Sequence, residues 1–157
     1  MSRAALASAL LAWLVLGCAD PTEVVVVVDT DLPVPPDLNI VVVATGPDGT
    51  PHESIAPIHA PEDLPAYVGL IHEDGALGPF LVRAEARRTG DRLVVRRDAV
   101  FTFEDGAVLM LTMHLLAACR GVRCAAFETC GDDGMCRSVL VSPSELREWR
   151  GSPPGID

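Results

Sequence analysis

The stretch Val24-Val25-Val26-Val27-Val28, which Asp29-Thr30-Asp31 follows, decides how this chain can fold. Five consecutive β-branched residues favour a strand over a helix, because branching at Cβ restricts the side chain against the preceding helical turn. A second apolar run, Leu38–Thr45, ends in the turn signal Gly46-Pro47-Asp48-Gly49. The beginning of the body therefore predicts two strands, separated by a proline-rich connection.

Short apolar segments continue to alternate with turns as far as residue 116. We expect strands at residues 66–71, 80–87, 93–95, 100–103 and 107–116, the fourth either continuing the third or beginning a new strand. Residues 50–65 contain four prolines and little periodicity, so we expect a long loop there. Short strands with turns roughly 8–12 residues apart predict a mainly β fold, an antiparallel β-sandwich over residues 23–117 with immunoglobulin-like or transthyretin-like topology. A closed soluble barrel is the alternative.

The composition fits a folded domain that avoids nucleic acid. The chain has 157 residues, of which 49% are hydrophobic and only 4% aromatic, and its formal net charge is −10. The apolar content excludes global disorder, and the negative charge repels phosphate backbones, so we expect no nucleic-acid partner. The sequence contains neither a phosphate-binding glycine loop nor a G-x-S-x-G motif, and we expect no cofactor and no catalytic residue.

The N-terminal residues have the pattern of an export signal. Arg3 precedes an apolar run, residues 4–17, which is shorter than the roughly 20 residues needed to span a bilayer. The run ends in Val15-Leu16-Gly17-Cys18, which resembles the lipobox of bacterial lipoproteins. This resemblance implies that residues 1–17 are removed, that Cys18 carries the lipid, and that residues 18–22 form a tether. Ala19 favours the outer membrane, and an ordinary signal peptide with an incidental cysteine is the alternative.

Four cysteines gather in the segment 118–141, at Cys119, Cys124, Cys130 and Cys136. An even number of cysteines in an exported chain predicts two disulfides, and three connectivities remain open. A zinc site would usually show closer C-x₂-C pairs. A zinc site and free thiols are therefore the less favoured alternatives.

The tail, residues 142–157, contains the signals of a short helix. Ser142-Pro143-Ser144-Glu145 fits a helix start, with a capping serine, proline at the first helical position and glutamate three residues after the cap. Leu146 and Trp149 would share one face of this helix, and Gly151 would end it. We expect Trp149 to pack on the sandwich; a place in a partner interface is the alternative.

Two acidic clusters are weak candidates for calcium. Asp29 and Asp31, with Asp37 nearby, lie where a strand meets a loop, and Asp132 and Asp133 lie between glycines in the cysteine segment. Carboxylate oxygens suit calcium, but neither cluster has the spacing of an EF-hand, and solvated turn residues are the alternative. We therefore expect no metal site. The four histidines, His52, His59, His72 and His114, are scattered and form no metal-binding motif.

One part of the chain is rich in arginine. Its members are Arg83, Arg87, Arg88, Arg92, Arg96 and Arg97. Strand alternation would place Arg83 and Arg87 on one outer face, beside Arg92 or Arg96. Such a face could bind an anionic polymer or a lipid headgroup, or it could simply be solvated.

The whole pattern resembles a group of uncharacterised lipoproteins from high-G+C predatory soil bacteria. The resemblance is carried by the lipobox, residues 26–32, 78–80 and 119–124, and the later Cys130 and Cys136. It implies an architecture and no activity. We expect a membrane-anchored, non-catalytic surface binding or structural module of the cell envelope, with a protein or polysaccharide partner. The alternatives are an accessory subunit of an envelope complex and a β-sandwich enzyme with a site near His52, His59 or His72.

Overall fold

The computed structural model describes residues 21–34 and 36–151. The predicted signal peptide and Cys18 lie outside these residues. No helix within the described ranges is long and apolar enough to cross a membrane. The strands are β1 (Glu23–Thr30), β2 (Leu38–Thr45), β3 (Pro51–Ile58), β4 (Ala66–Ile71), β5 (Phe80–Arg88), β6 (Arg92–Phe101), β7 (Val108–Leu115), β8 (Glu128–Cys130), β9 (Cys136–Ser138) and β10 (Arg147–Glu148).

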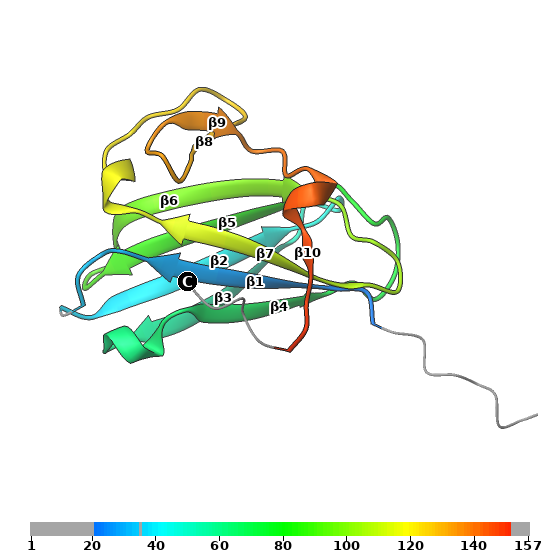
Figure 1. Ribbon diagram of the computed structural model, residues 1–157, viewed down its shortest axis with the longest axis horizontal. Helices are drawn as coiled ribbons and strands as arrows, with labels where there is room; N and C mark the ends of the chain where they lie inside the picture. Colours follow the sequence, from blue (N-terminus) through cyan, green and yellow to red (C-terminus); the bar gives the residue numbers. More distant parts are fainter. Residues whose placement is uncertain (1–20, 35, 152–157) are drawn as a thin grey trace, which may run out of the picture.

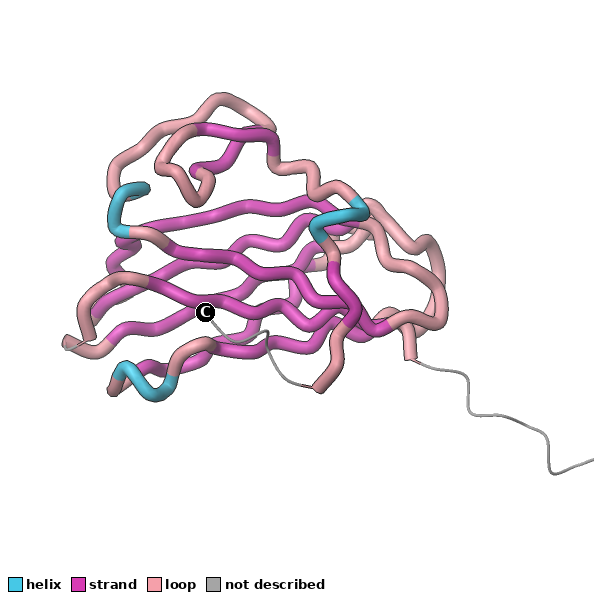
Figure 2. Tube along the Cα trace, viewed as in Figure 1, coloured by secondary structure: helices cyan, strands magenta, loops and turns pink. Residues whose placement is uncertain are grey.

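The strands form two stacked sheets and a small hairpin (Figures 1 and 2). The first sheet has the order β10-β7-β1-β4, the second β3-β2-β5-β6, and β8 pairs with β9. A mainly β, sandwich-like body is therefore confirmed. The helical residues of the described ranges lie in three 3₁₀ turns, η1 (Pro61–Asp63), η2 (Ala117–Cys119) and η3 (Pro143–Glu145).

The expectation of a wholly antiparallel arrangement is wrong at one pair of strands. β1 runs parallel to β7, in register from Glu23 opposite Val108 to Thr30 opposite Leu115. The chain crosses between the sheets four times, between β1 and β2, β3 and β4, β4 and β5, and β6 and β7. β7 then lies beside β1 and runs in the same direction.

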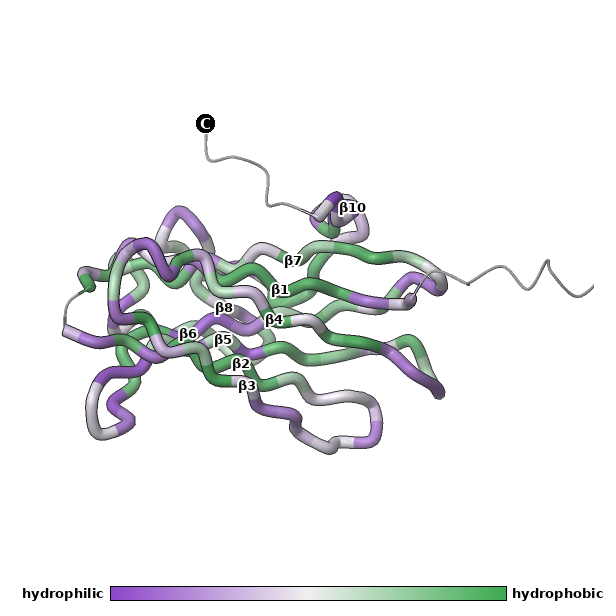
Figure 3. Tube along the Cα trace, turned by 90° about the horizontal axis from the view of Figure 1, so that it is seen from below, coloured by the Kyte–Doolittle hydropathy of each residue, from purple (hydrophilic) through white to green (hydrophobic). Residues whose placement is uncertain are grey.

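The valine run of β1 is buried on both of its faces. Val24, Val26 and Val28 belong to the main core between the sheets. Figure 3 shows that hydrophobic residues, in green, make up much of the strands of both sheets. Val25 and Val27 point the other way, into a second apolar cluster with Met110, Val108 and Trp149. A strand that is buried on both faces needs apolar residues at every position rather than at every second one, which explains the unbroken run.

The loop expected at residues 50–65 is wrong in its first half. Residues 51–58 form β3, which is an edge strand and pairs only with β2. Proline is tolerated in an edge strand, because a missing N–H on the free side costs no ladder hydrogen bond. The later segments 93–95 and 100–103 are largely one strand, β6, which ends at Phe101.

The helix expected in residues 142–157 is also wrong. Its start is present as the 3₁₀ turn η3, where Glu145 accepts a hydrogen bond from the Ser142 N–H at 2.8 Å. The chain then becomes extended, and β10 pairs with β7. The Trp149 N–H donates to the Val108 carbonyl at 2.9 Å. This backbone donor is therefore bonded to the sheet and not within a helix.

Trp149 packs on the sandwich as expected. Its ring covers the second apolar cluster and lies 6.0 Å from the Tyr67 ring, centroid to centroid. The outer face of β1 is thereby removed from water without a helix.

We predict that Trp149→Ala lowers the free energy of unfolding by about 2 kcal/mol, because Val25 and Val27 lose their cover. Urea unfolding of the two proteins measures this difference. Arg150→Ala is the matched control, since the Arg150 side chain is 83% exposed. Equal midpoints for the two variants would contradict the role of Trp149.

Candidate functional site

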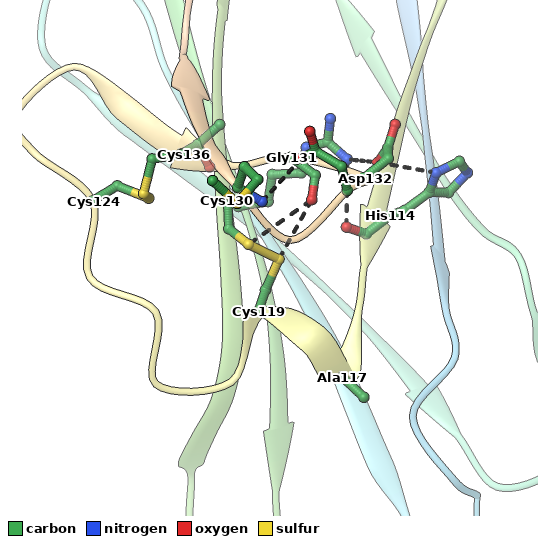
Figure 4. The surroundings of a disulfide bond; sticks show 12 residues. His114, Ala117, Cys119, Cys124, Cys130, Gly131, Asp132 and Cys136 are labelled. Atoms are coloured by element: carbon green, nitrogen blue, oxygen red, sulfur yellow. Dashed lines mark hydrogen bonds and ion pairs between the residues drawn. A yellow bond between two sulfur atoms is a disulfide. The ribbon is translucent and has the colours of Figure 1, made fainter.

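Two disulfides fix the cysteine segment beside the open edge of the sandwich. Cys119 pairs with Cys130 and Cys124 with Cys136 (Figure 4), so the segments that the two disulfides close overlap in the sequence. Disulfide formation is confirmed, and the zinc and free-thiol alternatives are wrong for these four residues. Cys119 and Cys130 are buried in the main core, which joins this segment to the body.

Arg97 holds the segment to both sheets. It lies on β6, and its side chain is buried, with only 8% of the residue exposed. Its Nη1 donates to the Asp132 carboxylate and, at 3.5 Å, to the His114 carbonyl on β7 (Figure 4). Arg97 therefore lies inside the sandwich, apart from the outer face predicted for Arg83 and Arg87.

Asp132 is the carboxylate at the centre of this contact. Its Oδ1 also lies 3.3 Å from His114 Nδ1. Burial acts to raise the pKa of Asp132, but the hydrogen bond and charge of Arg97, with His114, outweigh it and lower the pKa below 3.8. The residue that we considered for calcium thus serves as an anionic partner for Arg97.

The edge of β6 is covered by the same segment. The Asp98 N–H donates to Thr129 Oγ1 at 2.9 Å, and the Val100 N–H donates to the Val139 carbonyl at 2.7 Å. The Val141 N–H returns a bond to the Val100 carbonyl at 2.9 Å. An edge strand with free backbone groups invites association with other chains, and here part of that edge is closed.

A groove of about 1270 Å³ lies between the cysteine segment and the outer face of β5 and β6. Apolar side chains dominate it, including Leu81 and Val94 from the sheet and Phe127 and Leu140 from the segment. Phe127 is 85% exposed and Leu140 is 66% exposed. This volume exceeds the roughly 300–1,000 Å³ of most small-molecule sites.

The backbone presents Phe127 to solvent in an unusual conformation. Its φ is +63°, in the left-handed region that bulky residues avoid. The Phe127 carbonyl accepts a hydrogen bond from the Val139 N–H at 3.0 Å, which helps to hold this geometry. Strain of about 1–3 kcal/mol is retained at such positions only when the surroundings impose it, commonly at functional sites. Phe127 is the one aromatic residue between Cys119 and Cys136, which is the sequence signal that could have identified it.

A smaller pocket of about 470 Å³ opens where β7 meets the cysteine segment and the chain that leads to β10. Its lining mixes apolar side chains with charged ones, which include Arg97, His114, Asp132 and an ion pair of Arg137 with Glu145. Hydrogen bonds from the Ser142 N–H and from Arg137 lower the pKa of Glu145. Arg97 with Asp132 and Arg137 with Glu145 thus form two ion pairs in this pocket.

The remaining calcium candidates bind parts of the protein itself. Asp29 accepts from the Thr30 N–H at 2.8 Å and Asp31 from the Ala117 N–H at 2.5 Å. Asp133 accepts from the Met135 N–H at 2.9 Å, and Asp37 lies 3.5 Å from His59. Within the described ranges, no three potential ligands of the His, Cys, Asp or Glu type come together.

The arginine concentration is largely neutralised. Arg83 pairs with Asp98 at 2.8 Å, and Arg87 pairs with Glu85 and Asp91. The Arg88 guanidinium donates to the carbonyls of Pro33 and Pro36. Arg96 lies 3.8 Å from Asp98, and Arg97 pairs with Asp132, so four of the six arginines are in ion pairs.

The histidines proposed for an enzyme site lie in different surroundings. His72 stacks on Phe103 with centroids 5.3 Å apart, His59 faces Asp37, and His52 is exposed on β3. Of the four histidines, His114 is the one that contacts the cysteine segment, through Asp132.

Comparison with known proteins assigns no family. No family model, no curated protein and no solved structure matches this chain. A proposal for its function therefore rests on its own residues.

We predict that Asp132→Asn makes the free energy of unfolding depend less on pH in the acid range. Because folding lowers the pKa of Asp132, its contribution is present above the unfolded value near 3.8 and disappears as the pH falls through the folded value. The wild type should exceed the variant by up to about 1 kcal/mol at pH 5, since Asp132 is half exposed and its pair is screened. In urea unfolding the difference should vanish once the pH has fallen below the folded pKa of Asp132.

Asp133→Asn is the control for this measurement. It keeps an acceptor for the Met135 N–H and contacts neither Arg97 nor His114 in the described interactions. A wild-type curve with the same acid slope as Asp132→Asn would show that the Arg97 contact stabilises nothing.

Proposed function

We propose that this chain is a membrane-anchored lipoprotein of the bacterial cell envelope that acts as a non-catalytic binding module. The observation that carries the binding role is the apolar groove with Phe127 exposed at its wall. Exposed aromatic side chains held by a rigid frame are typical of the residues that dominate protein–protein binding. The two disulfides supply the frame.

A protein partner suits this groove better than a polysaccharide. Sugar-binding sites commonly stack aromatic rings on the sugar, whereas this chain has 4% aromatic residues and the groove contains a single ring, that of Phe127. Leu81, Val94 and Leu140 offer apolar contacts instead. Arg96 and Arg123 at the same groove add the second residue type enriched in binding hot spots.

The anchor is the lipobox cysteine, Cys18. Five residue steps separate Cys18 from the start of β1 at Glu23. They reach at most about 18 Å, because an extended chain advances roughly 3.3–3.6 Å per residue. The lipid would therefore hold the end of the sandwich where β1 begins close to the membrane, with the outer membrane favoured by Ala19.

The anchor predicts a specific mass for the protein extracted from membranes. Intact mass spectrometry should show loss of residues 1–17 and addition of three acyl chains, which together give stable attachment. Cys18→Ala should abolish the modification and release the protein from the membrane. Reduction should add about 4 Da to both proteins, as expected for two disulfides. An unlipidated wild type would overturn the anchor.

The groove predicts a protein within reach of Phe127. A photoreactive phenylalanine analogue placed at position 127 of the full chain should form a crosslinked adduct in membranes. The same analogue at Met135 is the matched control, because Met135 is 66% exposed in the same segment but does not line the groove. No adduct at 127, or equal adducts at both positions, would reject the binding role. The identity of the adduct also decides whether the chain is a subunit of a larger envelope complex.

A further inference from the structure

Strand β4 has a free edge that carries no proline and no charged residue of its own. Edge strands are commonly protected from other chains by proline, by charged side chains or by a covering segment. β3 contains Pro51 and Pro57, and the cysteine segment covers part of β6. β4 pairs with β1 alone and lies at the end of its sheet (Figure 1). Its six residues, Ala66–Ile71, have none of these protections, so this edge is open to a further strand.

The backbone groups of this edge point away from the protein. The His72 N–H donates to the Thr22 carbonyl at 2.9 Å, which makes these residues a hydrogen-bonded pair of the β1–β4 ladder. Such pairs alternate along an antiparallel ladder, so the N–H and C=O groups of Tyr67, Gly69 and Ile71 face outward. No residue of the described ranges forms a backbone hydrogen bond with them. Gly69 is exposed, and because it has no side chain, its exposure is that of the backbone itself.

Apolar side chains lie on both faces of this edge. On the outer face, Tyr67 is 45% exposed and Ile71 is 66% exposed, and the Tyr67 ring lies beside Trp149. Val68 and Leu70 alternate with them on the inner face, where they pack against the main core but are only half-buried. A neighbouring strand would therefore bury apolar side chains on both faces at once.

We infer that β4 pairs with β4 of a second copy of this chain, antiparallel and centred on Gly69. In this register Gly69 lies opposite Gly69 and Tyr67 opposite Ile71, and each such pair exchanges two backbone hydrogen bonds. On the inner face, Val68 of one copy meets Leu70 of the other. Every opposed pair is apolar, an aromatic ring meets a β-branched side chain, and the contact closes on a two-fold axis. This self-complementarity selects a second copy over an unrelated strand.

The small size of the contact makes it depend on the anchor, so the inference rests on the proposed lipidation of Cys18. A single strand pair buries less than the roughly 1,200–2,000 Å² of a standard interface. Attachment of both copies to one membrane raises their effective concentration and offsets this weakness. The two β1 starts would lie roughly 20 Å apart in the dimer, given the spacing and rise of strands. Each tether reaches up to about 18 Å, so both lipids can enter the same membrane.

One charged group opposes the pairing. Glu23 extends from β1 over Gly69, and its Oε1 lies 2.7 Å from the position that a Cβ on Gly69 would occupy. The two-fold axis passes beside Gly69, so the Glu23 carboxylates of the two copies would approach each other. Like charges across a strand pair are destabilising. Removal of this charge should therefore strengthen the dimer.

The test uses the full chain in membranes, with a photoreactive phenylalanine analogue at position 67. Ile71→Pro removes an outward N–H that the dimer needs and that β1 does not use. Ile55→Pro is the matched control, because Ile55 is 59% exposed on the other edge strand and alternates in step with Pro51 and Pro57. Its N–H therefore also faces outward.

The otherwise unchanged chain should give a crosslinked dimer in which residue 67 is joined to residues 69–73 of the second copy. Ile71→Pro should lower the dimer yield about tenfold, because each dimer loses two hydrogen bonds. Ile55→Pro should retain the dimer. Equal yields from the two proline variants would show that strand pairing through β4 does not hold the copies together.

Two further variants test the register and the role of the membrane. Glu23→Gln should raise the dimer yield about threefold, because two like charges no longer meet. An unchanged or lower yield would overturn the register centred on Gly69. Cys18→Ala should lower the yield at least about tenfold, since the released chains lose their high effective concentration. A dimer retained by Cys18→Ala would overturn the dependence on the anchor.

A lipidated chain that gives no dimer, a dimer joined outside residues 69–73, or an adduct only with a different protein would each overturn the inference. The 4 Da shift on reduction checks that each variant has folded. If Ile71→Pro fails this check, the crosslinked position and Glu23→Gln decide the outcome. Intact mass reports lipidation of Cys18 independently of the dimer, so failure of the anchor is distinguishable from failure of the pairing.

Discussion

Arg97 projects from β6 into the interior, where a guanidinium is costly to bury unless a carboxylate accompanies it. Ala84 lies opposite it on β5 and leaves space for the long side chain. The body supplies the His114 carbonyl, but the carboxylate comes from Asp132 in the cysteine segment. The segment must therefore sit at this edge for the sandwich to bury Arg97, and the disulfides then hold the rest of the segment in place. The groove exists because its wall is fixed in this way.

Much of the body could be predicted from the sequence, because burial leaves a local signature in strands. The valine run of β1 and the apolar run of β2 predict their strands directly. The sequence did not predict β3, because its side chains are mostly exposed and its prolines indicate a loop. An edge strand nevertheless accepts prolines. The parallel pairing of β1 with β7 is a property of strand order, which no local pattern contains. The helix start predicted at Ser142 forms a single 3₁₀ turn. The chain then becomes extended and pairs with β7, where Trp149 covers the apolar outer face of the sheet.

The candidate site was predictable only in part. The cysteine count predicts two disulfides, but their pairing depends on which loops meet in space. Arg97 shares its side of β6 with Val95, Ala99 and Phe101, an alternation that places it inside. Phe127 was visible as an isolated aromatic residue in a polar loop. Its place at the groove depends on the sheet, whose lining residues Val100 and Leu81 lie 27 and 46 residues earlier in the sequence.

The place of β1 in its sheet has a mechanical consequence. β1 lies between two partners, in register with eight residues of β7 and six of β4. A pull applied at Glu23 along the strand would load the hydrogen bonds of both ladders in shear, since they run across the strand direction. Those bonds must then break together. In a hairpin pulled open from its end, by contrast, the bonds break one after another. A protein held at the start of this strand would therefore resist a pull along the strand until both ladders break.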